Sequence, residues 1–477
     1  MELLQGKDVL YDSDISVGYS SQVDSEIDIE GIVNNFNQPL NNRPWINVDA
    51  NGYVRPHQIQ PFTEPTGMAR RLPIDATPLD YFELLITNPQ TDITLISLLV
   101  EETNRYANNL LRQQQAHQPN SRISNWTRTN EDEMKAFLGL LLATGIVKKP
   151  TLESYWNESN KTWLINTPGF TNVMRRNRFQ NILQFLHCNN NENAVPHGQE
   201  GYDPIHKITP VLNLLNETLS HHYRLGRDVT VDESLVGFKG RNHLVQYMPA
   251  KKSHRWGPKF FLLAESDTGY VHQLRLYAGK SQNQRNPQGV TFDIVVDLLQ
   301  PHFNKYHHVT LDNFFCSPSL CHHLYQNGMF CTGTVRVFRK GMPPSFRNIQ
   351  IAKGEVTVRQ QGPLMAVALQ NASNSRGVER ELPNVAVVYN SKMGGVDLSD
   401  QHISYYSPEI RSVKMWKKVL MNLLSRVIAN SYILYTQVRM LHKKMSRLEF
   451  TVSVVQGLIG HFREERKSKV IYFISNI

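Results

Sequence analysis

Residues 228–238 read DVTVDESLVGF, and at this point the apolar spacing of the chain changes from helical to strand-like. Upstream, in ITPVLNLLNETLSHHYRL (residues 208–225), apolar residues recur at helical intervals. Downstream, β-branched and apolar residues alternate with polar ones, which is typical of half-buried strands. Residues 229–278 therefore predict a group of antiparallel strands, with a hairpin turn at residues 267–269, Asp-Thr-Gly.

The following region alternates between helices and strands. The helix-like residues 291–303 are followed by a strand–helix–strand pattern over residues 307–338. Residues 384–390, NVAVVYN, predict a further strand, and the interval before them is rich in Gly, Pro and Arg. This alternation indicates an α/β domain that is interrupted by an insertion with short strands of its own.

Composition and periodicity divide the chain into seven segments. Helical patterns flank the α/β region on both sides, and the N-terminal residues are polar, acidic and without clear periodicity, as in disordered chains. The segments are an acidic, largely disordered region (1–75), a helical segment (76–228), the first part of the core (229–340), the insertion (341–381), the last part of the core (382–407), a second helical segment (408–465) and a short tail (466–477).

The charge of the chain points to a polyanionic partner. The formal net charge is +9, yet residues 1–30 carry eight acids and one base, so the remainder is strongly basic. The N-terminus lacks the features of a signal peptide, and the longest apolar window, AFLGLLLATGIV, is too short to span a bilayer. We therefore expect an intracellular, soluble protein with no membrane partner.

Four cysteines in a chain of 477 residues argue against a disulfide framework. Three of them, Cys316, Cys321 and Cys331, lie close together in the sequence, with His322 and His323 between them. Their spacing matches no common zinc pattern, so the sequence favours a structure without zinc at this place.

Three aspartates of the α/β region occur in comparable settings. Asp232 lies within the first strand, Asp312 ends a later strand, and Asp397 follows residues 384–390 by way of a Gly-Gly loop. A folded α/β sheet can gather carboxylates from several strand ends, and such carboxylates hold the paired divalent ions of phosphoryl transfer. Taken singly, each aspartate is also explained as a helix cap or an Asx turn, and the sequence leaves both explanations open.

Basic residues surround these acids in the sequence. No acid occurs between Glu233 and Glu265, while six bases are interleaved there with Phe238, Tyr247 and Trp256. Cations beside aromatic rings can bind phosphates and unstacked bases. The alternative is that these residues form the solvated surface of a hairpin and bind no ligand. Residues 408–447 hold nine bases against one acid and predict a basic helical face. The candidate DNA-binding residues are Lys239, Arg241, Lys251, Lys252, Arg255, Lys259, Lys417 and Lys418.

Several long motifs, in the right order, resemble one family. They are YDPIHKITPVLNLLNETLSHHYRLGRDVTVDESLVGFKGR (202–241), YMPAKKSHRWGPKFFLLAESDTGYV (247–271), VTLDNFFCSPSL (309–320), GTVR (333–336) and YNSKMGGVDLSDQHISYYS (389–407), followed by WKKV and SYILY. The chain resembles piggyBac-type DNA transposases over residues 76–465, and most closely piggyBac transposable element-derived proteins.

The resemblance implies an RNase H-like catalytic core with an inserted small β-rich domain and flanking all-α segments for dimerisation and DNA binding. It implies cut-and-paste transposition at TTAA sites with two divalent ions, Mg²⁺ or Mn²⁺. By motif, the catalytic acids are Asp232, Asp312 and Asp397, which would bind the metals, with Asp400 as an accessory acid. The expected partners are double-stranded DNA, namely transposon ends and the TTAA target, and a second copy of the chain. Nuclear localisation follows from this substrate.

Two further expectations concern the motif around Asp397. We hypothesise that Gly394 and Gly395 let the chain turn tightly after a strand and bring Asp397 to the metals. If the segment is helical, Asp400 shares a face with Asp397. The resemblance also places Trp416 where the family has a tryptophan near the active site.

The sequence departs from the family pattern in two places. Family transposases usually finish with a Cys/His-rich zinc module that binds the transposon ends, whereas here no cysteine follows Cys331. The interval 367–383 is short and lacks the tryptophan that members tend to carry there. The alternative function is therefore a domesticated, catalytically silent DNA-binding nuclear protein.

Overall fold

The computed structural model describes residues 9–12, 44–48, 60–114, 126–157, 169–249, 251, 254–279, 288–352, 355–369, 383–408, 410–438 and 445–462. The chain divides into two compact units, each built from separated segments. The sheet unit comprises Met1–Arg70 and Leu219–His402, and the helical unit comprises Arg71–Thr218 and Ile403–Ile477. Each unit is described by itself below.

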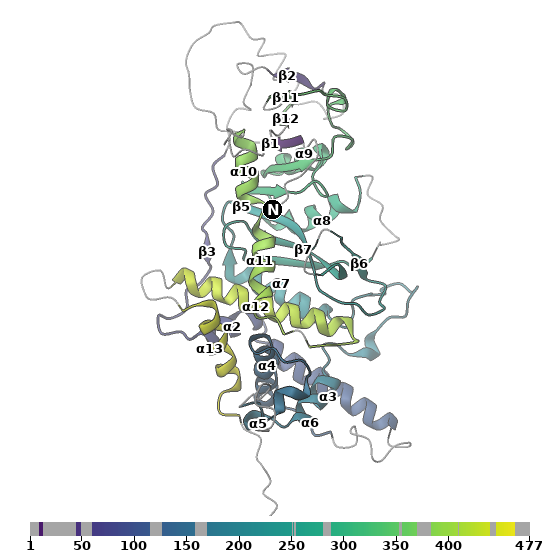
Figure 1. Ribbon diagram of the computed structural model, residues 1–477, viewed down its shortest axis with the longest axis vertical. Coiled ribbons are helices and arrows are strands. Elements are labelled where there is room, and N and C mark those ends of the chain that lie inside the picture. The colour runs from purple at the N-terminus through teal and green to yellow at the C-terminus, as the bar shows by residue number, and fades with distance from the viewer. Residues whose placement is uncertain are drawn as a thin grey trace, which may run out of the picture. The chain divides into compact units, whose positions relative to one another are not determined.

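The centre of the sheet unit is a run of five strands in the order β8-β7-β5-β9-β10. Figure 1 labels β5 and β7 of this run. Strand β5 pairs antiparallel with β7, which pairs antiparallel with β8, whereas β9 and β10 run parallel to β5. This confirms the predicted antiparallel group and its hairpin after β7. The bounds are β5 Asp228–Leu235, β7 Trp256–Glu265, β8 Val271–Leu276, β9 His308–Leu311 and β10 Phe330–Val335.

Further strands extend this sheet at both edges. On the β7 side lies β6, and beyond β10 the order continues through β1, β12 and β11 to β2. A separate two-stranded ladder joins β3 to β4. The bounds are β1 Val9–Asp12, β2 Ile46–Val48, β3 Gly67–Met68, β4 Tyr223–Arg224, β6 Val245–Tyr247, β11 Val356–Gln361 and β12 Leu364–Leu369.

Two sequence predictions concern these edge strands. The short strands expected in the insertion are present as β11 and β12, but they join the main sheet through β1 rather than forming a sheet of their own. Strands β1, β2 and β3 come from the N-terminal region that was predicted to be largely disordered. Backbone pairing with a partner far along the chain leaves no local periodicity from which such short strands could be recognised.

Four α-helices of the sheet unit connect or cover the strands, and two 3₁₀ turns, η5 Gln300–His302 and η6 Pro344–Phe346, accompany them. Helix α9 links the parallel strands β9 and β10, and the side chain of Ser317 caps its start. Helices α10 and α11 follow one another across a short turn (Figure 1). The bounds are α8 Val290–Leu299, α9 Pro318–Gln326, α10 Asn384–Lys392 and α11 Gly395–Ser404.

Helix α10 corrects the prediction of a strand at residues 384–390. Its β-branched residues favour a strand locally, but tertiary packing overrides that preference. Val385, Ala386 and Tyr389 form one helical face and pack against Met365 and Val367 of β12. In a strand, successive side chains point to opposite faces, so this cluster could not form.

The helical unit is an all-α assembly in which each apolar stripe is buried against a neighbour. Helix α4 begins at the cap Asn130, whose side chain accepts a hydrogen bond from the Glu133 backbone N–H. The bounds are α2 Pro78–Ile86, α3 Leu95–Gln114, α4 Glu131–Ile146, α5 Phe170–Val173, α6 Arg176–Phe185, α7 Thr209–His222, α12 Met415–Val438 and α13 Arg447–Ile459, with 3₁₀ turns η2 Glu153–Trp156 and η4 Asn191–Asn193.

Helix α12 is the buried centre of this unit, and some bases of the predicted basic helical face lie inside it, whereas Arg411 and Lys414 are exposed and Arg439, Lys443 and Lys444 fall outside the described residues. Lys417 is 7% exposed and Arg426 is 1% exposed. The Arg426 guanidinium Nε donates to Asn422 Oδ1 within the helix. Within the part of the chain that the structure describes, no helix has the combination of length and apolar character needed to cross a bilayer.

Candidate functional site

Two of the predicted aspartates meet at the ends of neighbouring parallel strands. Val231 of β5 pairs with Leu311 of β9, so Asp232 and Asp312 are the next residues on two adjacent strands. Carboxyl ends of parallel strands meet at one edge of a sheet, and this register places the two side chains together. One carboxylate oxygen from each, together with one from Glu233, lies within 4.8 Å of the others.

The face of β5 that carries Asp232 is turned toward helices α10 and α11. Alternate residues of a strand share a face, so Thr230, Asp232 and Ser234 point the same way. The Thr230 hydroxyl donates to the Lys392 carbonyl over 2.7 Å, and the Ser234 hydroxyl donates to Asp400 Oδ1 over 2.6 Å. Asp232 therefore projects toward α11, between two anchored hydroxyls.

Helix α11 carries the other two predicted acids, and it contacts the sheet closely because its first residue is glycine. A Cβ on Gly395 would lie 2.8 Å from the Glu265 carbonyl oxygen, whereas one on Gly394 would meet nothing within 4 Å. This corrects the glycine hypothesis: the chain leaves a helix rather than a strand, and Gly395 permits close packing. The helical form also places Asp397 and Asp400 three residues apart on one face.

Lys251 joins the acids of α11 to those of the sheet. Its ammonium lies 3.2 Å from Asp397 Oδ1. Burial alone lowers the pKa of Lys251, but attraction to Asp232, Asp397 and Asp400 raises it overall. The structure thus assigns Lys251, predicted as a DNA ligand, to the carboxylate site.

Electrostatic repulsion is concentrated at the sheet end of the site. Burial, followed by the neighbouring Glu233, raises the pKa of Asp232 well above its usual range. Burial and Glu233 also raise the pKa of Asp312, although hydrogen bonds from two backbone N–H groups and the charge of Arg336 oppose the shift. Several carboxylates held together in this way stabilise one another's protonated form unless a cation compensates them.

The donor set fits a hard divalent ion. All three grouped ligand atoms are carboxylate oxygens, which Mg²⁺ and Mn²⁺ prefer. Glu233 Oε2 is buried and has no hydrogen-bond partner among the described residues, as expected of an atom that awaits a ligand. Sequence reasoning missed Glu233, although its position directly after Asp232 was a visible signal.

Asp312 also satisfies the alternative explanation that the sequence left open. Its Oδ1 accepts hydrogen bonds from the backbone N–H groups of Phe314 and Phe315, at 2.9 and 3.3 Å. This is an Asx turn. Both described bonds end on Oδ1, so the turn orients the carboxylate and is compatible with metal binding through the second oxygen.

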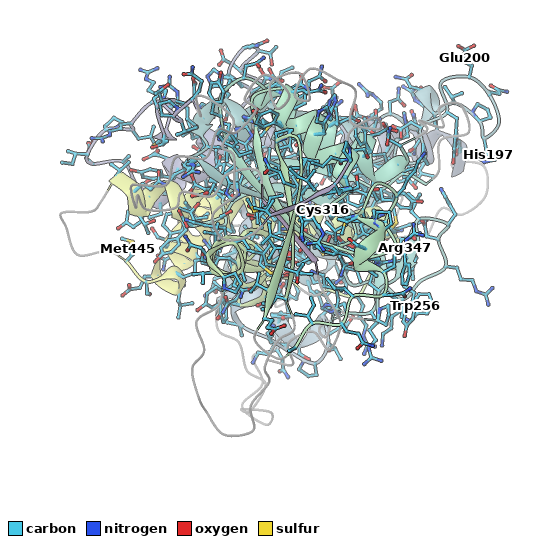
Figure 2. The ribbon with its side chains drawn as sticks, turned by 90° about the horizontal axis from the view of Figure 1, so that it is seen from above. His197, Glu200, Trp256, Cys316, Arg347 and Met445 are labelled. Atoms are coloured by element: carbon cyan, nitrogen blue, oxygen red, sulfur yellow. The ribbon has the colours of Figure 1, made fainter. Side chains whose placement is uncertain are left out.

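Cationic and aromatic side chains form a second feature of the sheet unit, next to β5. A cavity of about 600 Å³ is lined by Phe238, Lys239, Gly240, Arg241, Asn242, Val245 and Trp256. Lys239, Arg241 and Arg255 are exposed. The rings of Tyr247 and Trp256 are both half exposed, and their centroids lie 4.6 Å apart. Trp256 is labelled in Figure 2.

The remaining predicted DNA ligands have other surroundings. The Lys259 ammonium lies over the rings of Phe261 and Phe314, at 4.6 and 4.7 Å from their centroids, and it is attracted by the acids of the site. Lys252 falls outside the described residues. Lys418 is half-buried on α12.

Lys417, which was also predicted as a DNA ligand, is buried. Its ammonium donates to the carbonyls of Leu183 and Gln184 near the end of α6. Burial lowers its pKa to about 8. The lysine therefore satisfies orphan helix carbonyls inside the protein, a role that charge counting cannot distinguish from a surface one. Its neighbour Trp416 is buried against His187.

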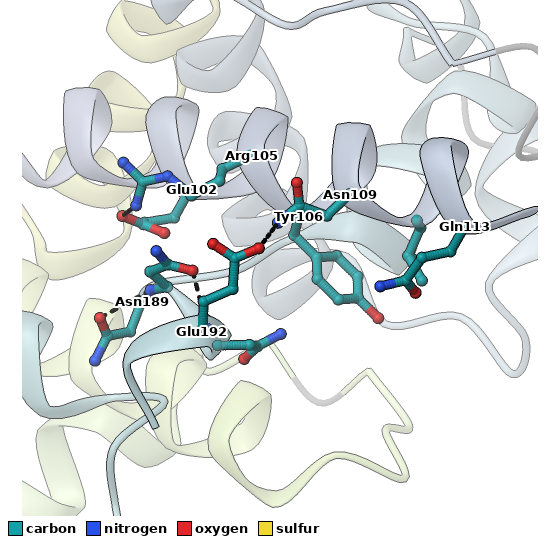
Figure 3. Close-up of a pocket in the computed structure, with 10 residues that line it drawn as sticks. Glu102, Arg105, Tyr106, Asn109, Gln113, Asn189 and Glu192 are labelled. Atoms are coloured by element: carbon teal, nitrogen blue, oxygen red, sulfur yellow. Dashed lines mark hydrogen bonds and ion pairs between the residues drawn. The ribbon is translucent and has the colours of Figure 1, made fainter. Parts of the chain in front are cut away.

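A second cavity, of about 210 Å³, lies in the helical unit (Figure 3). Its lining is rich in amides, and Asn109 donates to Glu192 Oε1 over 2.9 Å across it. Glu102 and Arg105 form an ion pair along α3 at its edge. The lining contains none of the predicted site residues.

Comparisons with known proteins agree with this arrangement. The family model described as Transposase IS4 matches residues 77–432. Human piggyBac transposable element-derived protein 3 is 27% identical over 419 residues, covering 80% of this chain and 66% of that protein. This chain thus spans just under two thirds of that relative's length. Human piggyBac transposable element-derived protein 5 is 22% identical over 437 residues, covering 84% and 78% of the two chains.

One solved structure shares the fold. It is a cryo-EM structure of the piggyBac transposase synaptic complex with hairpin DNA. The match has a TM-score of 0.68 and 23% sequence identity, and it covers 84% of this chain and 83% of the other. At this identity the likeness concerns the mixed α/β fold alone.

Proposed function

This chain belongs to the piggyBac-type family of transposases, and we propose that it cleaves and rejoins DNA strands by metal-dependent phosphoryl transfer. The observation that carries the proposal is the meeting of Asp232, Glu233 and Asp312 at one end of the sheet, opposite Asp397 and Asp400. Separate chain segments supply these acids, and no local structural need explains their convergence.

The architecture supports an RNase H-like core. The strand order β8-β7-β5-β9-β10, with three antiparallel strands followed by two parallel ones, is the order that this fold class requires. In such a core the first strand and the fourth lie side by side, which brings their acids together. Here these strands are β5 and β9, which carry Asp232 and Asp312.

The residues of the site have distinct proposed roles. Asp232, Asp312 and Asp397 would hold two Mg²⁺ or Mn²⁺ ions, with Glu233 and Asp400 beside them. Bound ions of this kind supply an activated attacking oxygen and stabilise the leaving one. The Asx turn fixes the Asp312 carboxylate, and Ser234 fixes Asp400. Lys251 neutralises Asp397 and releases it when the site is filled.

The surface next to β5 is proposed to hold the DNA. Lys239, Arg241 and Arg255 suit phosphates, and the exposed rings of Tyr247 and Trp256 suit an unstacked base. The substrate would be duplex DNA at transposon ends and TTAA targets, acted on by a homodimer in the nucleus. These finer statements rest on the family.

A specific contact favours a second candidate function, a catalytically silent DNA-binding protein. Lys251 already pairs with Asp397, so the site has an internal cation at the place where a ligand acid is needed. If that ion pair persists with metal and DNA, the acids would remain as scaffold and the basic surface would still bind DNA.

Purified protein, supercoiled plasmid and a duplex ending in TTAA test the proposal, with Mg²⁺ or Mn²⁺ present. In Asp312→Asn the amide oxygen can still accept the bonds of the Asx turn, so the variant removes charge and keeps the turn. Asp297→Asn, an exposed acid of α8, is the matched control. Nicking or strand joining by wild type and control, but not by Asp312→Asn, supports the enzyme. Inert protein that still binds DNA with a steep salt dependence supports the second candidate.

A further inference from the structure

Three of the four cysteines of the chain converge on one point in the sheet unit. Cys321 Sγ lies 3.5 Å from Cys316 Sγ and 3.4 Å from Cys331 Sγ. All three are free thiols and are at most 1% exposed. Figure 2 labels Cys316 among the strands of the sheet. The fourth cysteine, Cys188, belongs to the helical unit.

Three different elements deliver these thiols. Cys316 ends the turn after β9, and its backbone N–H donates to the Asp312 carbonyl over 3.0 Å. Cys321 lies in α9 and Cys331 in β10. Gly333 of β10 leaves the space for Cys316, since a Cβ there would lie 2.7 Å from its sulfur. The convergence thus depends on a glycine as well as on three cysteines.

We propose that Cys316, Cys321 and Cys331 bind one thiophilic d¹⁰ metal ion, Zn²⁺ or Cu⁺. A tetrahedral ion with metal–sulfur bonds of about 2.3 Å separates its sulfurs by roughly 3.8 Å. The observed separations of 3.4 and 3.5 Å need only a few tenths of an ångström of expansion. Soft thiolates select such ions over Mg²⁺, so this site and the carboxylate site would not compete.

A cation lies beside the thiols to balance the negative charge of three thiolates. The charge of Arg339 acts on Cys316, and its guanidinium donates to the carbonyls of Asn313 and Phe314. Its Nε is buried and has no hydrogen-bond partner within the described ranges. A buried guanidinium N–H without a partner is costly next to neutral thiols, and the cation is compensated next to thiolates.

The competing explanation is that the cysteines act as small apolar side chains. Buried free cysteine packs well in a core, and the sequence spacing matched no zinc pattern. The common spacings of zinc ligands apply to cysteines and histidines on short loops. Here, a helix and a strand bring together cysteines that are farther apart in the sequence. Three sulfurs suit Cu⁺, while Zn²⁺ needs a fourth ligand, and the experiment below separates the two ions.

By binding all three cysteines, the ion would cross-link the turn that follows Asp312 to α9 and β10. It would therefore stabilise the sheet end of the carboxylate site without taking part in its chemistry. This inference goes beyond the proposed function and does not depend on it, because a catalytically silent protein would hold the ion equally well.

The test begins with protein expressed in medium supplemented with zinc or with copper and purified without chelators. Metal content is measured per chain by mass spectrometry for wild type, Cys321→Ala and the control Cys188→Ala. We expect about one ion per chain in wild type and control, thiolate-to-metal charge-transfer absorption, and at least a tenfold loss in Cys321→Ala. The medium that loads the protein identifies the ion.

A second measurement needs no variant. Chelator titration of the wild type should bleach the charge-transfer band, lower the melting temperature and expose three thiols to alkylation. The proposal is overturned if the wild type is metal-free from both media. It is also overturned if the wild type retains metal without the charge-transfer band, or if Cys321→Ala retains as much metal as the wild type. DNA cleavage plays no part in either readout, so failure here and failure of the proposed function are distinguishable.

Discussion

Replacing Asp232 by asparagine should stabilise the protein in the absence of metal. The Asp232, Glu233 and Asp312 ligand oxygens lie within 4.8 Å of one another. At that distance and an effective dielectric constant of about 20, each pair of unit charges repels by about 3.5 kcal/mol, and by more where the oxygens lie closer together. Lost attraction to Lys251 offsets part of the relief. We expect Asp232→Asn to be more stable by roughly 1–3 kcal/mol in EDTA, which raises the melting temperature by several degrees.

The pH dependence of the same variant has a definite sign. The pKa of Asp232 is raised in the folded state, so the protonated form favours folding and that stabilisation is lost as pH rises through the raised pKa. Metal-free wild type should therefore gain stability as pH falls from neutral toward the ordinary aspartate range, near 4. In Asp232→Asn this gain should be smaller.

Divalent metal should reverse the order of stability. An ion that binds only the folded state adds about 2.7 kcal/mol at a hundredfold excess over its dissociation constant. The free energy of unfolding of the wild type should rise by this amount in Mg²⁺ or Mn²⁺, and that of Asp232→Asn should rise much less. Melting curves in EDTA and in metal, at two pH values, measure all of these quantities. Wild type that is already the more stable protein in EDTA, or equal stabilisation of both by metal, would refute the reasoning.

Three further predictions concern the surroundings of the site. Arg241→Ala should weaken duplex binding and reduce the salt slope by about one, whereas Lys417→Met should leave the slope unchanged and lower the melting temperature, because its ammonium is internal. Gly395→Ala should cost about 1–3 kcal/mol in urea unfolding, since its Cβ would press on the Glu265 carbonyl. Trp256→Ala should weaken single-stranded oligonucleotide binding by about 1–3 kcal/mol and duplex binding less.

Local pattern predicted the centre of the fold because strands β5, β7 and β8 are contiguous in the sequence. Their alternation and the hairpin turn were visible without tertiary information. The secondary-structure predictions were wrong where packing or pairing with a residue far along the chain determines the local structure. Residues 384–390 become α10 because one helical face packs on β12, and β1 and β2 exist because strands beyond residue 330 pair with them.

The candidate site divides in the same way. The sequence places Asp232 in a strand and Asp312 at the end of another, but their meeting depends on the parallel pairing of β5 with β9, whereas the strand–helix–strand pattern implies parallel pairing only of β9 with β10. The environment of each lysine does not follow from the sequence. Lys251 contacts Asp397, and Lys417 caps α6. From the sequence, both were predicted to bind DNA because each is a basic residue. Charge counts report composition, while burial is decided by tertiary packing.

The electrostatic cost of the site bears on the choice between the two proposed functions. Lys251 balances acids of α11 and part of Asp232, but burial and the neighbouring Glu233 still raise the pKa of Asp232 and of Asp312. In a scaffold without turnover, many substitutions at Asp232 or Glu233 would relieve this repulsion and stabilise the fold, so nothing would hold the acids in place. If Asp232→Asn is measurably more stable than the wild type in EDTA, the repulsion between these carboxylates lowers the stability of the wild-type fold. Such a cost is expected of a site that binds metal and is unexplained in one that does not.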